Sequence, residues 1–294
     1  MQEYYKRAAV YSQKVHPFYV VPRVRYEFDH PEGTGHEVVT DIDDTVKSSG
    51  NLRLAGLIPL GGIDAQYERG QFYPGVFQFA LELAAHGTPQ GLLPLPVAVL
   101  TARAKEFLFA LELKTEHPVS IAYRQCGTDN GFDGWGLGPV LYGSVKEWIV
   151  WTRKGRRKFK NFKRLMEIDG THAAARGCAT DYIFIGDTGE GDTKAGVKMC
   201  ETFPRELRAM FMHAVSCDSE YCITPDDYTI NGVPVLFFKT YVGAARKAYE
   251  AGLMDKAGVQ RVIDRSVMEL ELSGAPRDCS KWEDMEMDIE QALM

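Results

Sequence analysis

The segment Glu37–Gly50, EVVTDIDDTVKSSG, decides the fold that we predict for this chain. Its valines and threonines favour a β-strand, and because side chains alternate along a strand, Asp41 and Asp43 are expected to point to the same side. Two carboxylates at the carboxyl end of a buried strand would repel each other unless a cation lay beside them, and ligands made only of oxygen suit Mg²⁺. The segment predicts a nucleophilic carboxylate at Asp41, an acid/base group at Asp43 and a bound Mg²⁺. The simpler alternative is a strand that ends in an acidic turn.

Two later segments have the pattern of buried strands that end in polar groups. The first is Asp181–Asp192, DYIFIGDTGEGD, an apolar run followed by a glycine-rich turn, and the second is Pro96–Thr101, PVAVLT, which Ala102 follows directly. The polar side chains after these strands are three carboxylates and one hydroxyl: Asp187, Glu190, Asp192 and Thr101. In open α/β sheets, ligands bind beyond the carboxyl ends of the strands, so these groups are candidates for the same site as Asp41.

A basic segment between these strands is predicted to be helical. Arg156–Met166, RRKFKNFKRLM, carries Lys158 near its start, with Lys160 as a close rival for a role in the site. The wider run of residues 152–164 holds eight lysines and arginines with interleaved aromatic residues, in a chain that is acidic as a whole. Such a face suits an anionic membrane surface, and a solvated helix face is an equally good interpretation.

The four segments, in this order, resemble the motifs of the haloacid dehalogenase (HAD) superfamily phosphatases. Within that superfamily, the chain resembles the phosphatidate-phosphatase family associated with actin patches. The resemblance spans roughly residues 37–255 and rests on five segments: Asp41–Lys47, Phe72–Gly75, Lys158–Met166, Ile185–Asp192 and Gly232–Asp255. It implies a Mg²⁺-dependent phosphatase that acts through an aspartyl-phosphate, with phosphatidate or a related phospholipid as the substrate.

The resemblance also assigns roles to single residues. Asp41 would be the nucleophile and Asp43 the general acid and base; a dehalogenase needs no such carboxylate at position 43. The metal ligands would be the side chains of Asp41 and Asp187 and the backbone carbonyl of Asp43, with Asp192 or Glu190 orienting the metal's waters or the site lysine. The phosphate-binding groups would be Thr45, Thr101, the amide of Ala102 and Lys158.

Two departures from the family pattern bear on the substrate. Thr101, Ala102 and Arg103 stand where the best-known members have a Ser-Pro turn, and Arg157 stands where a histidine often precedes the helix lysine. These departures bear on the identity of the substrate more than on the type of reaction. The alternatives are a phosphatase for soluble substrates such as sugars, nucleotides or phosphoproteins, and an interaction or scaffold subunit that keeps the fold without turnover.

Composition excludes some functional classes. The 294 residues are 45% hydrophobic, which supports an ordinary buried core, and the net charge of −6 argues against a nucleic-acid binder. Six scattered cysteines without metal-type spacing are typical of reduced intracellular thiols. No run of 18 apolar residues and no signal-peptide core occurs, so we expect a cytoplasmic or peripheral membrane protein, and a plastid or mitochondrial location stays open. The oligomeric state stays open as well.

Strands that alternate with helices predict an α/β protein with a HAD-like, doubly wound parallel sheet and a small or minimal cap. We expect an N-terminal helix and edge strand in residues 1–36, a catalytic domain in 37–255 and a helical tail in 256–294. Within the catalytic domain, residues 46–73 are a predicted flap or cap and residues 125–157 a basic helical insert. Strands are predicted at Val119–Tyr123, Arg208–Val215 and Val233–Phe238, and loops at Cys126–Gly143 and Thr171–Thr180. Helices are predicted at Val76–His86, near Lys105–Leu113, at Tyr241–Ala251, and, within the helical tail, at Lys256–Leu272 and Trp282–Leu293.

Overall fold

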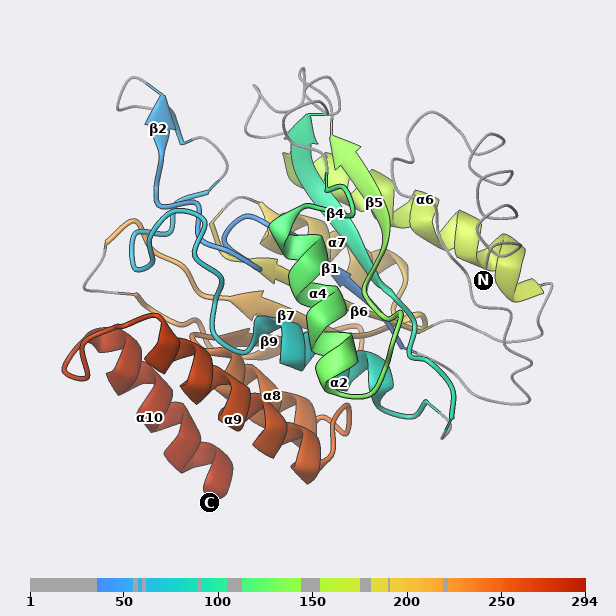
Figure 1. The fold of residues 1–294 in the computed structure, drawn as a ribbon. Helices are drawn as coiled ribbons and strands as arrows, with labels where there is room; N and C mark the ends of the chain where they lie inside the picture. The colour runs from blue at the N-terminus through green and yellow to red at the C-terminus, as the bar shows by residue number, and fades with distance from the viewer. Residues whose placement is uncertain are drawn as a thin grey trace.

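A seven-stranded sheet forms the centre of the computed structural model (Figure 1). The structure describes residues 36–54, 58–59, 62–88, 91–104, 113–143, 154–174, 181–189, 191–218 and 222–294. The strand order is β5-β4-β1-β6-β7-β9-β8, and every neighbouring pair is parallel except β8 and β9. The strands are β1 (His36–Thr40), β4 (Val97–Ala104), β5 (Leu137–Gly143), β6 (Asp181–Asp187), β7 (Leu207–His213), β8 (Tyr228–Ile230) and β9 (Val233–Phe238).

Both faces of the sheet are buried, because successive side chains of each central strand enter two different hydrophobic cores. In β1, Val38 belongs to one core and Val39 to the other, and in β6 Ile183 and Phe184 divide in the same way. This explains why these strands are almost continuous apolar runs, as is usual for parallel sheets that are covered on both faces.

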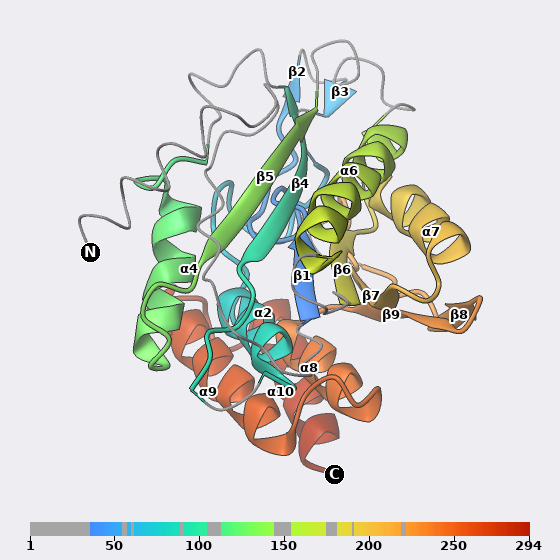
Figure 2. The same ribbon diagram turned by 90° about the vertical axis from the view of Figure 1, so that its right-hand side faces the viewer.

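Helices cover the two faces of the sheet (Figure 2). The first core takes in side chains of α2 (Val76–Ala85), α4 (Pro118–Asp129), α8 (Tyr241–Glu250), α9 (Lys256–Leu272) and α10 (Ser280–Leu293). The second takes in α6 (Lys154–Ala174) and α7 (Asp192–Thr202). The helix that follows β5 therefore lies on the opposite face of the sheet from α2 and α4. After this helix the chain returns to the middle of the sheet, where β6 pairs with β1. In open α/β sheets such a reversal of strand order is where ligands bind, so the ends of β1 and β6 are the expected place for a site.

Several predicted elements are confirmed within about two residues at their ends. They are the strands at Arg208–Val215 and Val233–Phe238 and the helices at Val76–His86, Tyr241–Ala251, Lys256–Leu272 and Trp282–Leu293. The predicted mostly parallel α/β sheet is also present. In the predicted flap, the small β2 (Arg53–Leu54) and β3 (Ile58–Pro59) form an antiparallel pair. The predicted N-terminal helix and edge strand, and the helix near Lys105–Leu113 apart from its last residue, lie outside the described residues.

The strand predicted at Val119–Tyr123 is wrong, because these residues lie in α4. His117 caps this helix by accepting a hydrogen bond from the Val119 amide at 3.2 Å, and Pro118 occupies its first turn, where proline is well tolerated. Val119, Tyr123 and Cys126 are buried, and this i, i+4, i+7 spacing is the helical period.

Two predicted loops are also corrected. The loop expected at Cys126–Gly143 contains the strand β5, so residues 137–143, inside the predicted helical insert, belong to the main sheet. The segment is rich in glycine, which favoured a loop, but a Cβ at Gly138 would lie 3.1 Å from Pro96 Cγ, so this glycine allows close packing. The loop expected at Thr171–Thr180 is wrong for residues 171–174, which belong to α6, and residues 175–180 lie outside the described residues. Among the described residues, we find no helix that is both long and apolar enough to cross a membrane.

Candidate active site

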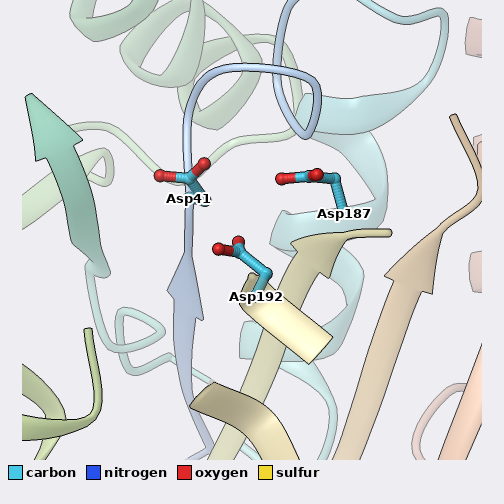
Figure 3. Close-up of side chains that lie close together, drawn as sticks. All are labelled: Asp41, Asp187 and Asp192. Carbon is cyan, nitrogen blue, oxygen red and sulfur yellow. The ribbon is translucent and has the colours of Figure 1, made fainter. Parts of the chain in front are cut away.

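Three buried carboxylates converge where β1 and β6 end (Figure 3). Asp41 directly follows β1, Asp187 is the last residue of β6, and Asp192 is the first residue of α7. One carboxylate oxygen from each lies within 4.8 Å of those of the other two, and the three residues are at most 2% exposed. The structure therefore brings together three of the predicted metal-site residues from segments about 150 positions apart.

Backbone contacts hold these carboxylates in place. The amide of Asp41 donates to the Ile185 carbonyl at 3.1 Å, which extends the β1–β6 pairing by one residue. Asp187 Oδ1 accepts a hydrogen bond from the Gly189 amide at 2.6 Å. Gly186 makes room for the third carboxylate, because a Cβ at this position would lie 2.7 Å from Asp192 Oδ2. The glycines of the predicted turn are thus needed for packing around the carboxylates.

Lys158 completes the cluster from α6. Its side chain is 1% exposed, its Nζ lies 2.9 Å from Asp41 Oδ2, and it also donates to Asp192 Oδ1. The first turn of α6 packs closely on the start of α7, since a Cβ at Gly155 would lie 2.6 Å from the Gly191 carbonyl oxygen. Lys160, the rival candidate, is exposed. Lys158 is therefore the lysine of the cluster.

The cluster has an excess of negative charge that burial makes unfavourable. Burial raises the pKa of Asp41 to about 8 against the opposing effect of Lys158, and burial followed by the charge of Asp192 raises the pKa of Asp187. Burial by itself would lower the pKa of Lys158, but the carboxylates, Asp192 first, raise it. Three carboxylates and one ammonium leave a deficit of positive charge that a divalent cation would balance.

The oxygen donors fit such a cation. Asp192 Oδ2 is buried, and the structure gives it no hydrogen-bond partner in the part of the chain that it describes. All donors in the cluster are carboxylate oxygens, the ligand type that Mg²⁺ prefers. Asp41, Asp187 and Asp192 are therefore the side chains that could hold Mg²⁺.

Asp43 lies at the edge of the cluster rather than inside it. Its side chain is 19% exposed, and Lys47 Nζ lies 4.0 Å from its Oδ1. β1 ends at Thr40, and Asp44 has a left-handed backbone with φ 61°, so strand alternation does not govern the direction of Asp43. Its charge is still close enough to raise the pKa of Asp41. This position leaves Asp43 in contact with solvent next to the buried carboxylates.

The predicted phosphate-binding residues come from two further elements. Thr45 is buried in the turn after β1, and its Oγ1 has no hydrogen-bond partner among the described residues. Thr101 is buried in β4, the neighbour of β1, and Ala102 follows it in the same strand. Glu190 lies outside the described residues.

Asp44, the third aspartate of the segment after β1, has no predicted role but is buried beside the site. Its buried carboxylate accepts hydrogen bonds from the amides of Ser49, Ile63 and Asp64. Burial raises the pKa of Asp44 to about 6, and the hydrogen bonds from Ser49 and Asp64 oppose the rise. The only sequence signal was a third aspartate in the Asp-Ile-Asp-Asp run, next to the two that were given roles.

No protein-family model, no curated protein and no solved structure matches this chain. The carboxylate cluster, its lysine and their position in the sheet are therefore the observations from which we infer a function.

The raised pKa of Asp41 predicts how stability depends on pH. Between its ordinary value of 3.8 and its folded value of about 8, the folded protein binds more protons than the unfolded chain. The contribution of Asp41 to the free energy of unfolding should therefore fall as the pH rises through this window. Mg²⁺ should offset the loss, because it binds the ionised carboxylates and displaces their protons.

This prediction is checked with melting temperatures at pH 5 and pH 8, with and without Mg²⁺. Asp41→Asn is the matched control, because it keeps the size of the side chain and removes the titrating group. Without Mg²⁺, Asp41→Asn should melt above wild type at pH 8, and the gap should shrink at pH 5. An equal difference in melting temperature between Asp41→Asn and wild type at both pH values would contradict the raised pKa of Asp41.

Proposed function

We propose that this protein is a Mg²⁺-dependent phosphomonoester hydrolase of the HAD type that acts through an aspartyl-phosphate on Asp41. The observation that carries the proposal is the buried Lys158 ammonium, which bonds to Asp41 and Asp192 beside Asp187. A fixed positive charge beside a carboxylate nucleophile is suited to an anionic phosphoryl group. The position of the cluster at the point where the strand order reverses also supports the HAD-like fold that the resemblance implies.

The chemistry divides hydrolysis into two steps. Asp41 attacks phosphorus, the bond from phosphorus to the ester oxygen breaks, and Asp43 donates a proton to the departing oxygen. Asp43 then takes a proton from water, the hydroxyl attacks phosphorus, and the bond to Asp41 breaks to release phosphate. The partial exposure of Asp43 supports this role, since leaving group and water both reach the site from solvent.

The remaining residues bind and orient the phosphoryl group. Lys158 supplies a positive charge, and its bond to Asp192 holds the ammonium in place. The hydroxyl groups of Thr45 and Thr101 and the amide of Ala102 are the proposed donors to the phosphoryl oxygens. The side chains of Asp41 and Asp187 and the backbone carbonyl of Asp43 would hold Mg²⁺, with Asp192 beside them. When bound, Mg²⁺ neutralises the charge of the approaching phosphate and carboxylate.

The substrate that we propose is phosphatidate or a related phospholipid, and a peripheral contact with an anionic membrane goes with it. Arg156, Lys160 and Lys163 are exposed along one stripe of α6 at spacings of four and three residues. Lys158 of the same helix points into the buried cluster. The stripe is therefore available to an anionic surface while Lys158 serves the site.

The function is tested with a panel of phosphate esters, assayed with Mg²⁺ and with a chelator. The panel contains phosphatidate and lysophosphatidate in mixed micelles, soluble sugar and nucleotide monophosphates, and phosphopeptides. Mg²⁺-dependent release of phosphate from phosphatidate supports the proposal as stated. Release from soluble esters alone supports a soluble-substrate phosphatase. Absence of turnover on every substrate would refute the enzyme and leave a scaffold subunit.

Neutralising the stripe is expected to weaken membrane binding without slowing the chemistry. The triple variant Arg156→Gln, Lys160→Gln, Lys163→Gln should bind anionic vesicles less tightly by about 1 kcal/mol per charge, or roughly 100-fold in total. Vesicle co-sedimentation at two salt concentrations measures the binding, and turnover of a soluble ester measures the chemistry. Lys256→Gln, which removes an exposed lysine from the helices on the other side of the sheet, should change neither.

If wild type shows no salt-sensitive binding to vesicles, the membrane contact is wrong and the stripe is a solvated face or docks a protein. Loss of soluble turnover in the triple variant would mean that the stripe is part of the active site.

A further inference from the structure

The carboxylate of Asp44 connects two parts of the chain that are distant in sequence. Its Oδ1 accepts the Ser49 amide at 2.8 Å, and its Oδ2 accepts the amides of Ile63 at 2.5 Å and Asp64 at 3.0 Å. One carboxylate thus satisfies three backbone donors, two of which come from residues 19 and 20 positions further along the chain. Hydrogen bonds to an ionised acceptor are the strong ones, so this is a firm attachment for residues 62–64.

The backbone around Asp44 is built for this contact. Asp44 has φ 61°, a left-handed conformation that aspartate adopts far less often than glycine. Gly62 lies directly against the carboxylate, because a Cβ at Gly62 would come within 2.1 Å of Asp44 Oδ2. At the end of the segment, Asp64 Oδ2 accepts a hydrogen bond from the Tyr73 hydroxyl at 2.9 Å. Residues 62–64 are therefore held at both ends.

The attached segment borders the turn that follows Asp187 at the end of β6. A Cβ at Gly189 would lie 2.7 Å from Ile63 Cγ1 and 3.1 Å from Asp187 Oδ1, so the Ile63 side chain packs on this turn beside the carboxylate cluster. Ile63 remains partly exposed. It is thus a partly exposed apolar group at the margin of the carboxylate cluster.

Other contacts fix the backbone of Asp44 independently of its carboxylate. His213 Nδ1 lies 2.8 Å from the Asp44 carbonyl oxygen, and the Tyr241 hydroxyl donates to the Thr45 carbonyl at 2.6 Å. The His213 ring packs edge-on against Tyr73, with 4.4 Å between ring centroids. Because the main chain has these supports, a change confined to the Asp44 side chain should release residues 62–64 more than the loop that carries Asp41.

We propose that Asp44 is a positioning residue whose carboxylate holds residues 62–64 against the Gly189 turn, so that Ile63 forms an apolar wall of the substrate entrance. This role rests on the proposed phosphatase function, which needs a substrate to reach Asp41. Three amide donors occupy the Asp44 carboxylate, and Asp44 is not one of the three residues, Asp41, Asp187 and Asp192, that could hold a metal ion. Asp44 acts through Ile63 rather than on the reacting atoms.

The test is Asp44→Asn, studied by hydrogen–deuterium exchange without substrate and by steady-state kinetics. An asparagine keeps one acceptor oxygen and replaces the other with an amide that cannot accept a hydrogen bond. Exchange at the amides of Ile63 and Asp64 should rise by about 10- to 100-fold, the range for loss of a hydrogen bond to a charged group. Exchange in β6 and β7 should stay unchanged. The KM for a phosphate ester should rise by more than kcat falls.

Ile63→Ala is the matched control, because it removes the wall and keeps all three hydrogen bonds to Asp44. It should reproduce the rise in KM without the rise in exchange at Asp64. Unchanged exchange in Asp44→Asn would overturn the attachment, and so would faster exchange across the whole sheet. Faster exchange at Ile63 and Asp64 with an unchanged KM would overturn the positioning role.

Two further outcomes are a variant that does not fold and a wild type that hydrolyses no phosphate ester. If Asp44→Asn does not fold, Tyr73→Phe releases the same segment from the Asp64 end, and exchange at Asp64 should rise; no rise would overturn the proposal. If wild type hydrolyses no phosphate ester, the proposed function fails and the positioning role fails with it. The exchange measurement then still decides whether Asp44 holds the segment, since it needs no substrate.

Discussion

Asp41→Asn is expected to abolish Mg²⁺-dependent phosphate release, with a loss in kcat of roughly 10⁴-fold or more, on the scale seen when other enzymes lose their nucleophile. An amide is a poor nucleophile and a weaker ligand for a divalent cation than a carboxylate. Both losses come from the same side chain, because the Asp41 carboxylate bonds to Lys158 and is also one of the three carboxylates that could hold the metal ion. The measurement is phosphate release at saturating Mg²⁺ on the best substrate of the panel.

The matched control is Asp278→Asn, which makes the same chemical change at an exposed position outside the cluster. It should retain wild-type activity. The folded state of Asp41→Asn is checked by its melting temperature, which should not fall below that of wild type in the absence of Mg²⁺, since the variant removes a carboxylate whose charge is unfavourable there. Turnover comparable to wild type in a folded Asp41→Asn protein would show that Asp41 is not the nucleophile.

Asp43→Asn is expected to slow the chemical step by about 10²–10⁴-fold, the usual contribution of general acid–base catalysis. The variant keeps the backbone carbonyl, so Mg²⁺ binding should change little. The loss should be largest for esters with a poor leaving group, such as an alkyl phosphate, because these need a proton as the bond to phosphorus breaks. Single-turnover rates on an alkyl and a nitrophenyl ester measure the two cases.

The comparison between leaving groups separates catalysis from a structural effect. If Asp43 is the general acid, the nitrophenyl ester should lose much less rate than the alkyl ester in the first step, because its leaving group departs without a proton. An equal loss on both esters would point to a disturbed site instead. An unchanged rate on the alkyl ester would rule out Asp43 as the acid.

The elements around the site were predictable from local patterns. The apolar runs before Asp41 and Asp187 predicted two buried strands, and the rule that ligands bind beyond the carboxyl ends of parallel strands predicted that their carboxylates would meet. The structure brings these two carboxylates together with Asp192. Helices with a clear 3.6-residue period, such as Tyr241–Glu250, were predictable for the same reason. Periodicity and strand ends are properties of neighbouring residues, so the sequence carries them directly.

Where local patterns mislead, the cause is a contact between distant residues. The glycine-rich segment Cys126–Gly143 was predicted as a loop, yet its Gly138 lies in β5, where the strand packs closely on Pro96. The choice between Lys158 and Lys160 was open in the sequence, since two residues apart on a helix they point in different directions. The close contact between Gly155 and Gly191 seats α6 against α7, with Lys158 turned toward the carboxylates and Lys160 toward solvent.

Asp44 shows most clearly that local sequence patterns do not predict contacts between distant residues. By itself, the sequence determined that strands and helices alternate, that carboxylates follow two of the buried strands, and that a basic helix precedes the second of them. Only the tertiary structure decided which lysine enters the cluster, that Asp43 stays at its edge, and that Asp44 binds the amides of Ile63 and Asp64. The physical reason is that secondary structure follows from side chains a few positions apart, whereas these contacts depend on how separate elements pack.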